Sequence, residues 1–179
     1  MKKLIGLAGV LALSACGGPS QQPQTSNQVQ HATGPEWVTR GSGAFTSEKG
    51  RVFYGVGIAS GIRNAAMRRA TADARARSEI GTQLDAFVSR LNATGAGRGG
   101  AASPDGDQLK TYLLTQTTIV DHWVDNDGSE WALAQLELEK AKSELDKAAD
   151  VNPQLKQAVK TSGDRAFDEL NAEGGRLKR

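Results

Sequence analysis

The sequence has few of the residues that most often carry chemistry. Among its 179 residues there is one cysteine, Cys16, so an intramolecular disulfide is excluded. There are two histidines, His31 and His122, which leaves little from which to build a Ser-His-Asp triad. Aromatic residues make up 5% of the chain, so the core has to rely mainly on small and aliphatic side chains.

The first residues have the layout of a secretory signal. Lys2 and Lys3 precede an uncharged apolar run, 4–13, that is too short to span a bilayer as a permanent helix. The run Leu13-Ser14-Ala15-Cys16 resembles the bacterial lipobox, in which the cysteine is acylated and the preceding peptide is removed. We therefore expect 1–15 to be a lipoprotein signal peptide and Cys16 to be a lipid anchor; an ordinary signal peptide or an uncleaved anchor is the alternative.

The charge is close to balanced. Lys and Arg total 22 against 20 Asp and Glu, and loss of Lys2 and Lys3 with the signal would leave 20 of each. No stretch combines basic and aromatic residues in the manner of a nucleic-acid platform. The composition therefore argues against a nucleic-acid partner.

The lipidated cysteine is followed by a segment with the composition of a flexible tether. Residues 17–34 are rich in Gln, Ser, Gly and Pro, and Val29 is their only aliphatic residue larger than alanine. A flexible chain of this length has an end-to-end distance of roughly 23 Å. His31 lies alone in the tether, so we expect no metal role for it. We expect an α+β domain over 35–148, with Trp37 sealing one edge of the core, and a C-terminal amphipathic helix with a basic tail over 149–179.

The first half of this domain predicts a strand over 51–59, followed by a long helix over about 63–91. Val52, Tyr54, Val56 and Ile58 fall on one face of the strand, and Gly55 and Gly57 fall on the other. The first half of the helix is rich in alanine. Since glycines leave a strand face without side chains, we expect this helix to pack closely across that strand.

The second half predicts two further strands and more helix. Residues 92–107 suggest a loose loop, 109–124 a long strand whose opening could be helical, 125–129 a hairpin loop and 130–138 the return strand. The pattern turns helical from 139. Asn152-Pro153 suits the start of another helix, which Gly174-Gly175 would stop. That helix carries Leu155, Val159, Ala166 and Leu170 on one face, and it could pack on the domain or serve as a handle for a partner.

No stretch predicts catalysis. Gly55-x-Gly57-x-x-x-Gly61 comes near the dinucleotide fingerprint, but its spacing differs and the strands are too few for a doubly wound sheet. Asp121, Asp125 and Asp127 read as turn-forming acids, His122 as a half-buried sheet residue, and Asp73 with Arg77 as a surface pair. We predict no catalytic residue, cofactor, metal or small-molecule substrate, and so no enzyme.

Several short motifs, in order, resemble the twenty-kilodalton bacterial lipoprotein family (Lpp-twenty-like). The resemblance implies a strand–helix–strand–strand module with a long helix on a short antiparallel sheet, an outer-membrane location and no catalytic residues; some members build disks around the flagellar motor. The glycine-rich loop at 93–107 and the C-terminal helix depart from that pattern. The motifs are Pro35-Glu36-Trp37-Val38, 53–59, 74–80, Val120-Asp121-His122-Trp123-Val124 and Trp131-Ala132-Leu133-Ala134.

These observations lead to a lipid-anchored, non-enzymatic scaffold that self-associates or docks on envelope machinery, with the flagellar motor as one candidate. Gly17 after Cys16 favours the outer membrane, with the domain facing the periplasm. The alternative is a regulatory adaptor that reaches through the periplasm to an enzyme such as a peptidoglycan synthase. An envelope hydrolase with His122 as general base is the third hypothesis.

Overall fold

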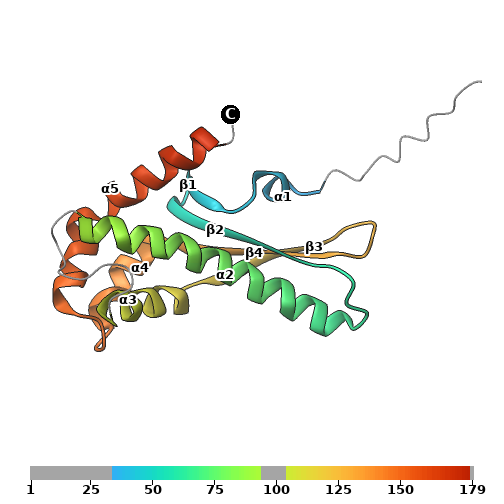
Figure 1. Cartoon of the computed structure of the whole chain (residues 1–179), viewed down its shortest axis with the longest axis horizontal. Coiled ribbons are helices and arrows are strands. Elements are labelled where there is room, and N and C mark those ends of the chain that lie inside the picture. The colour runs from blue at the N-terminus through green and yellow to red at the C-terminus, as the bar shows by residue number, and fades with distance from the viewer. Residues whose placement is uncertain (1–33, 94–103, 178–179) are drawn as a thin grey trace, which may run out of the picture. The chain divides into compact units, whose positions relative to one another are not determined.

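The computed structural model describes residues 34–93 and 104–177. The expectations for the signal peptide, Cys16, the tether and His31, for most of the 92–107 loop and for the last two residues lie outside the described residues. The elements, labelled in Figure 1, are α1 (Glu36–Arg40), β1 (Gly43–Ser47), β2 (Gly50–Ala59), α2 (Ala65–Leu91), α3 (Pro104–Thr115), β3 (Thr118–Val124), β4 (Glu130–Glu137), α4 (Leu138–Glu144), the 3-10 turn η2 (Leu145–Lys147) and α5 (Pro153–Leu177).

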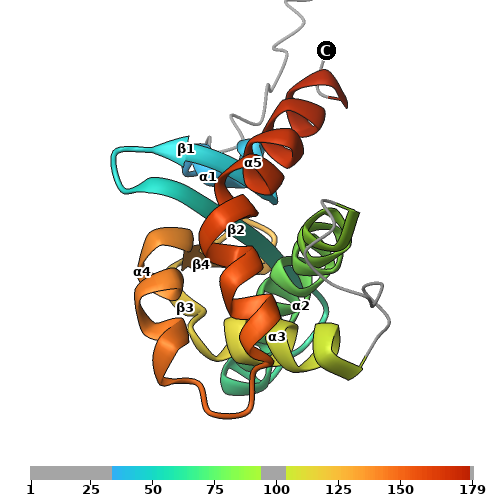
Figure 2. The same cartoon turned by 90° about the vertical axis from the view of Figure 1, so that its left-hand side faces the viewer.

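The four strands form one antiparallel sheet in the order β1-β2-β4-β3. α2 lies along one face of this sheet. α3 and α5 pack against the C-terminal half of α2 (Figure 1, Figure 2). The predicted α+β fold, with a long helix on a short antiparallel sheet and a further C-terminal helix, is confirmed. The hairpin loop is confirmed too: the Asp125 N–H donates to the Ser129 carbonyl at 2.9 Å.

The close contact between α2 and the glycine face of β2 is confirmed. A Cβ atom on Gly55 would lie 2.1 Å from the carbonyl oxygen of Ala76, and one on Gly57 would lie 2.2 Å from that of Ala72. These distances are far below van der Waals contact, so only glycine fits at either position. The space in front of Gly55 and Gly57, the first two glycines of the near-fingerprint, is thus filled by helix backbone.

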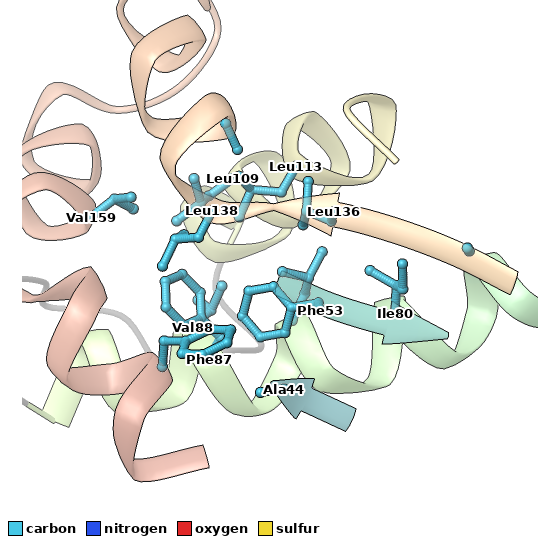
Figure 3. Packing of buried hydrophobic residues seen from close by; sticks show 14 of the residues in the cluster. Ala44, Phe53, Ile80, Phe87, Val88, Leu109, Leu113, Leu136, Leu138 and Val159 are labelled. Carbon is cyan, nitrogen blue, oxygen red and sulfur yellow. The ribbon is translucent and has the colours of Figure 1, made fainter. Parts of the chain in front are cut away.

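The main core lies between the α2 side of the sheet and the helices. Phe53 of β2 stands at its centre, with the ring of Phe87 at 5.5 Å and that of Phe167 at 4.9 Å, both edge to face. Phe53 and Phe87 lie among the aliphatic side chains of Figure 3. Phe167 and Val159 come from α5 and are fully buried. Of the two alternatives for the C-terminal helix, the structure shows the first: it packs on the domain.

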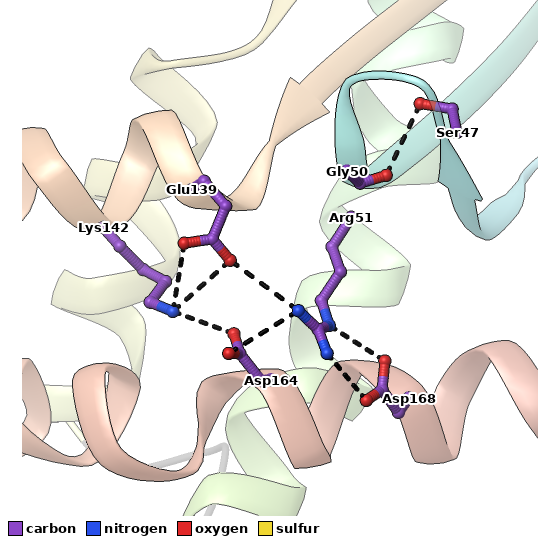
Figure 4. Close-up of polar contacts among 7 residues, drawn as sticks. All are labelled: Ser47, Gly50, Arg51, Glu139, Lys142, Asp164 and Asp168. Carbon is purple, nitrogen blue, oxygen red and sulfur yellow. Dashed lines mark hydrogen bonds and ion pairs between the residues drawn. The ribbon is translucent and has the colours of Figure 1, made fainter.

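An ion network fastens α5 to β2 and α4 (Figure 4). Arg51 donates two hydrogen bonds of 2.9 Å to Asp168, and Lys142 donates one of 2.8 Å to Asp164. The hydrogen bond from Arg51 lowers the pKa of Asp168, and that from Lys142 lowers the pKa of Asp164. The predicted start of the helix is confirmed, since Asn152 Oδ1 accepts from the Gln154 N–H at 2.8 Å.

The elements differ from the expectations in three places. The long strand over 109–124 is α3 followed by β3, so its opening is helical, which is the alternative that the sequence left open; Leu109 and Leu113, four residues apart, are both buried on one helix face. The helix α5 does not stop at 174–175 but runs to Leu177, since a glycine inside a helix costs only about 1 kcal/mol. The strand β1 is a fourth strand that the sequence analysis did not predict, because five residues are too few for alternation to reveal it.

Candidate interaction surfaces

Cys16, the one site residue that the sequence proposes, lies outside the described residues. Among the described residues, no three or more His, Cys, Asp or Glu side chains gather in a way that could hold a metal ion. None of the helices in the described ranges has the length and apolar character needed to cross a membrane. The described residues do form one polar cluster and two partly exposed surfaces.

The polar cluster is centred on His122, which the structure places, as predicted, half-buried in the sheet. Its Nε2 lies 2.6 Å from Asp73 Oδ1, and its Nδ1 lies 2.9 Å from Arg69 Nη2. Asp73 therefore pairs with His122 across 49 residues and not with the predicted Arg77. The reason is its place on α2: it follows the sheet-facing Ala72, on the side of the helix that faces β3.

These contacts assign the histidine protons. A guanidinium group can only donate, so Nδ1 accepts from Arg69 and the Nε2–H donates to Asp73. Both ring nitrogens are thus engaged with α2. The arrangement fastens β3, an edge strand of the sheet, to the long helix.

The first surface is the sheet face opposite α2, here called the aromatic face. It carries five of the nine aromatic residues of the chain, including all three tryptophans. Tyr54 and Trp37 are buried there, and the others are half-buried. The main core, in contrast, has phenylalanine as its only fully buried aromatic residue type. The five are Trp37, Phe45, Tyr54, Trp123 and Trp131.

Strand pairing places a row of large side chains across one end of this face. Ile58 pairs with Trp131, which in turn pairs with Trp123. The two indole rings lie 6.2 Å apart, and Ile58 is 36% exposed. The buried indole N–H of Trp131 has no hydrogen-bond partner in the described part of the chain.

In the described ranges, α1 is the only helix that contributes to the aromatic face. It is five residues long, and the indole N–H of Trp37 anchors it by donating to Asp121 at 2.8 Å. At its other end the guanidinium of Arg40 lies over the rings of Phe45 and Tyr54, at 5.1 and 4.8 Å from their centroids. So short a helix covers the middle of the face and leaves the row beside it half-covered.

The chain also begins its described part on this face. A Cβ atom on Gly34 would lie 2.9 Å from Cη2 of Trp123, so the backbone of Gly34 rests on that indole ring. The predicted tether therefore reaches the domain at the half-covered row. The aromatic face is therefore on the side of the domain from which the predicted tether leaves.

The second surface is the outer face of the first half of α2. α3 and α5 pack against the second half, where Gly81 lies beside Leu114, and Phe87 beside Gly163. The first half keeps a shallow, mainly apolar groove with Met67 63% exposed. The groove is lined by Met67, Ala70, Thr71, Ala74, Arg75 and Ser78.

Sequence reasoning foresaw neither surface, although a signal existed for the first. The predicted hairpin loop at 125–129 already places Trp123 opposite Trp131. Period-two alternation then puts both indoles on one face. Comparison with protein-family models, curated proteins and solved structures found no match to this chain. The resemblance to the twenty-kilodalton lipoprotein family stays a prediction from its short motifs.

Proposed function

We propose that this chain is a lipid-anchored, non-enzymatic lipoprotein of the bacterial outer membrane, whose domain acts as a scaffold. It would self-associate or dock on other envelope proteins, with the flagellar motor as one candidate. The lipobox-like Leu13-Ser14-Ala15-Cys16 supports the anchor. The scaffold role is supported by the exposed, mainly apolar outer face of the first half of α2.

That face has the properties of a helix-docking surface. Ala70 and Ala74 are exposed and four residues apart, so a partner helix could approach the backbone closely. Met67 adds a flexible apolar side chain that adapts to different partners. Arg63, Arg75 and Arg77 are exposed on the same stretch and favour a partner with acidic residues.

The test is the native mass of residues 17–179, without lipid, over a range of concentrations. We expect a discrete oligomer, or an envelope protein that cross-links to this face in cells. Ala70→Glu should abolish either, while Ala172→Glu on the exposed side of α5 is the matched control and should leave it intact. A monomer at every concentration, with no cross-linked partner, would contradict the proposal.

The alternative, a regulatory adaptor of an envelope enzyme, is motivated by the tether and by the amphipathic C-terminal helix. The apolar side of α5 is packed in the core, which leaves the tether as its support. Deleting 17–34 should then abolish enzyme activation while the domain stays folded. Normal activation after the deletion would count against the adaptor.

A further inference from the structure

We propose that the aromatic face is the membrane-facing side of the domain, and that the half-covered row of Ile58, Trp131 and Trp123 inserts at the boundary between the lipid headgroups and the acyl chains. The inference rests on the proposed lipid anchor at Cys16. It goes further by assigning an orientation to the domain and a lipid surface as the occupant of this face.

The side chains suit that occupant. Tryptophan combines a large apolar ring with one polar N–H and is enriched where hydrocarbon meets water at membrane surfaces. All three tryptophans of the chain lie on this face, beside the partly exposed Ile58. The α2 side of the sheet has no tryptophan, so the asymmetry between the two sides is complete.

The path of the chain favours the same orientation. Seventeen residues, 17–33, separate Cys16 from Gly34, and Gly34 rests on the ring of Trp123. The flexible tether that the composition predicts here would span about 23 Å on average, which would keep lipid within reach of this face. A tether this short raises the effective concentration of the surface to the millimolar range, and weak contacts are then sufficient for docking.

The charges beside the row indicate which lipids it tolerates. Asp121 lies on the face, and Asp125 and Asp127 lie in the hairpin loop that follows Trp123 and Val124. Two arginines are also near: the guanidinium of Arg40 lies over Phe45 and Tyr54, and that of Arg75 donates to the Ile58 carbonyl oxygen. The carboxylates outnumber these guanidinium groups, so anionic headgroups should add no attraction. We therefore expect docking on zwitterionic lipid that added anionic lipid does not strengthen, unlike adsorption through basic residues.

The single cysteine makes a direct test possible. The chain from residue 16 onward is coupled through the Cys16 thiol to a maleimide lipid in phosphatidylcholine and phosphatidylethanolamine vesicles, with or without brominated acyl chains. Because bromine quenches only indoles in contact with it and every tryptophan lies on this face, quenching reports the face itself. We expect clear quenching and a blue-shifted emission in the coupled protein.

Two variants sharpen the result without removing the tryptophans. Ile58→Asp should reduce the quenching at least about twofold, because a carboxylate resists transfer into the acyl region. Gln108→Asp adds the same charge on the exposed side of α3, which packs against α2, and should leave the quenching unchanged. Circular dichroism checks that both variants fold; if Ile58→Asp does not, the quenching of the unmodified sequence still decides.

An absence of quenching in the coupled protein would overturn the proposal, as would equal quenching in both variants. An emission shift that depends on protein concentration without vesicles would also overturn it, by showing a second copy on this face. Chemical coupling supplies the anchor whether or not a cell acylates Cys16. Failure of the anchor prediction, read from labelling with radioactive palmitate in cells, is therefore distinguishable from failure of this inference.

Discussion

The two faces of the sheet differ in how they meet their covering helix. Toward α2, β2 presents Gly55 and Gly57, and the helix backbone touches the strand. On the other face the same strand presents Tyr54, Val56 and Ile58, and the cover is the five-residue α1. The glycines of β2 allow the long helix α2 to pack directly on the strand backbone. On the other face, where the side chains of β2 are large, the cover is a short helix, and part of the face remains exposed to a possible partner.

The largest expected effect comes from breaking the closed face at its centre. Phe53→Ala removes the ring between Phe87 and Phe167 and should lower the free energy of unfolding by about 3–5 kcal/mol. Trp123→Ala, on the half-covered face, should cost less than half as much because its ring is already partly solvated. Urea titration of both variants checks this, and equal costs would mean that the two faces do not differ.

Next in size is the backbone contact itself. Gly57→Ala places a Cβ atom 2.2 Å from the Ala72 carbonyl oxygen and should destabilise the domain by about 1–3 kcal/mol. Gly174→Ala in α5 meets open space and should instead stabilise by about 0.5–1 kcal/mol, since alanine favours the helix. Thermal unfolding of this pair separates steric crowding from loss of glycine flexibility.

Two tryptophans on the half-covered face give a finer comparison. Trp37→Phe loses the hydrogen bond to Asp121 and should cost about 1 kcal/mol. Trp131→Phe removes a buried N–H that has no partner among the described residues, so it should be nearly neutral or slightly stabilising. Chemical denaturation of both variants measures the difference, and a larger cost at Trp131 would reveal a partner for its N–H.

The smallest effect concerns pH. The pKa values of Asp164 and Asp168 lie below the ordinary 3.8 because Lys142 and Arg51 donate hydrogen bonds to their charged forms. Folding therefore gains stability from these carboxylates above about pH 4, and loses it as the pH falls through their lowered pKa values. Both side chains are about half exposed, so each should contribute less than about 1 kcal/mol.

The matched measurement is stability against pH. Below pH 4 the unfolding free energy of Asp168→Asn should fall less with decreasing pH than that of the unmodified protein. Asp107→Asn, which replaces an exposed acid in the first turn of α3, should keep the steeper fall of the unmodified protein. Identical profiles for the two variants would show that the ion network adds nothing to stability.

The features that could be predicted from the sequence are those that depend on residues close together in the chain. The alternation of residues 52–58 gave both faces of β2, and the turn at 125–129 set the register that brings Trp123 to Trp131. The pairing of Asp73 with His122 could not be foreseen, because it depends on how α2 crosses the sheet. β1 was missed because five residues are too few for a pattern. The sequence leaves the helix α3 as the alternative to a strand, because the threonines of 115–118 are typical of a strand.

The place of α5 bears on when the domain can fold. Arg51 and Asp168, which form hydrogen bonds with each other, are 117 residues apart in the chain. The ring of Phe53 packs against that of Phe167, which also comes from α5. Contacts this distant in sequence slow folding, because long loops must close before they form. The core is consequently complete only after the last helix has been synthesised, so the domain cannot reach its final packing while Phe167 is still missing from the growing chain.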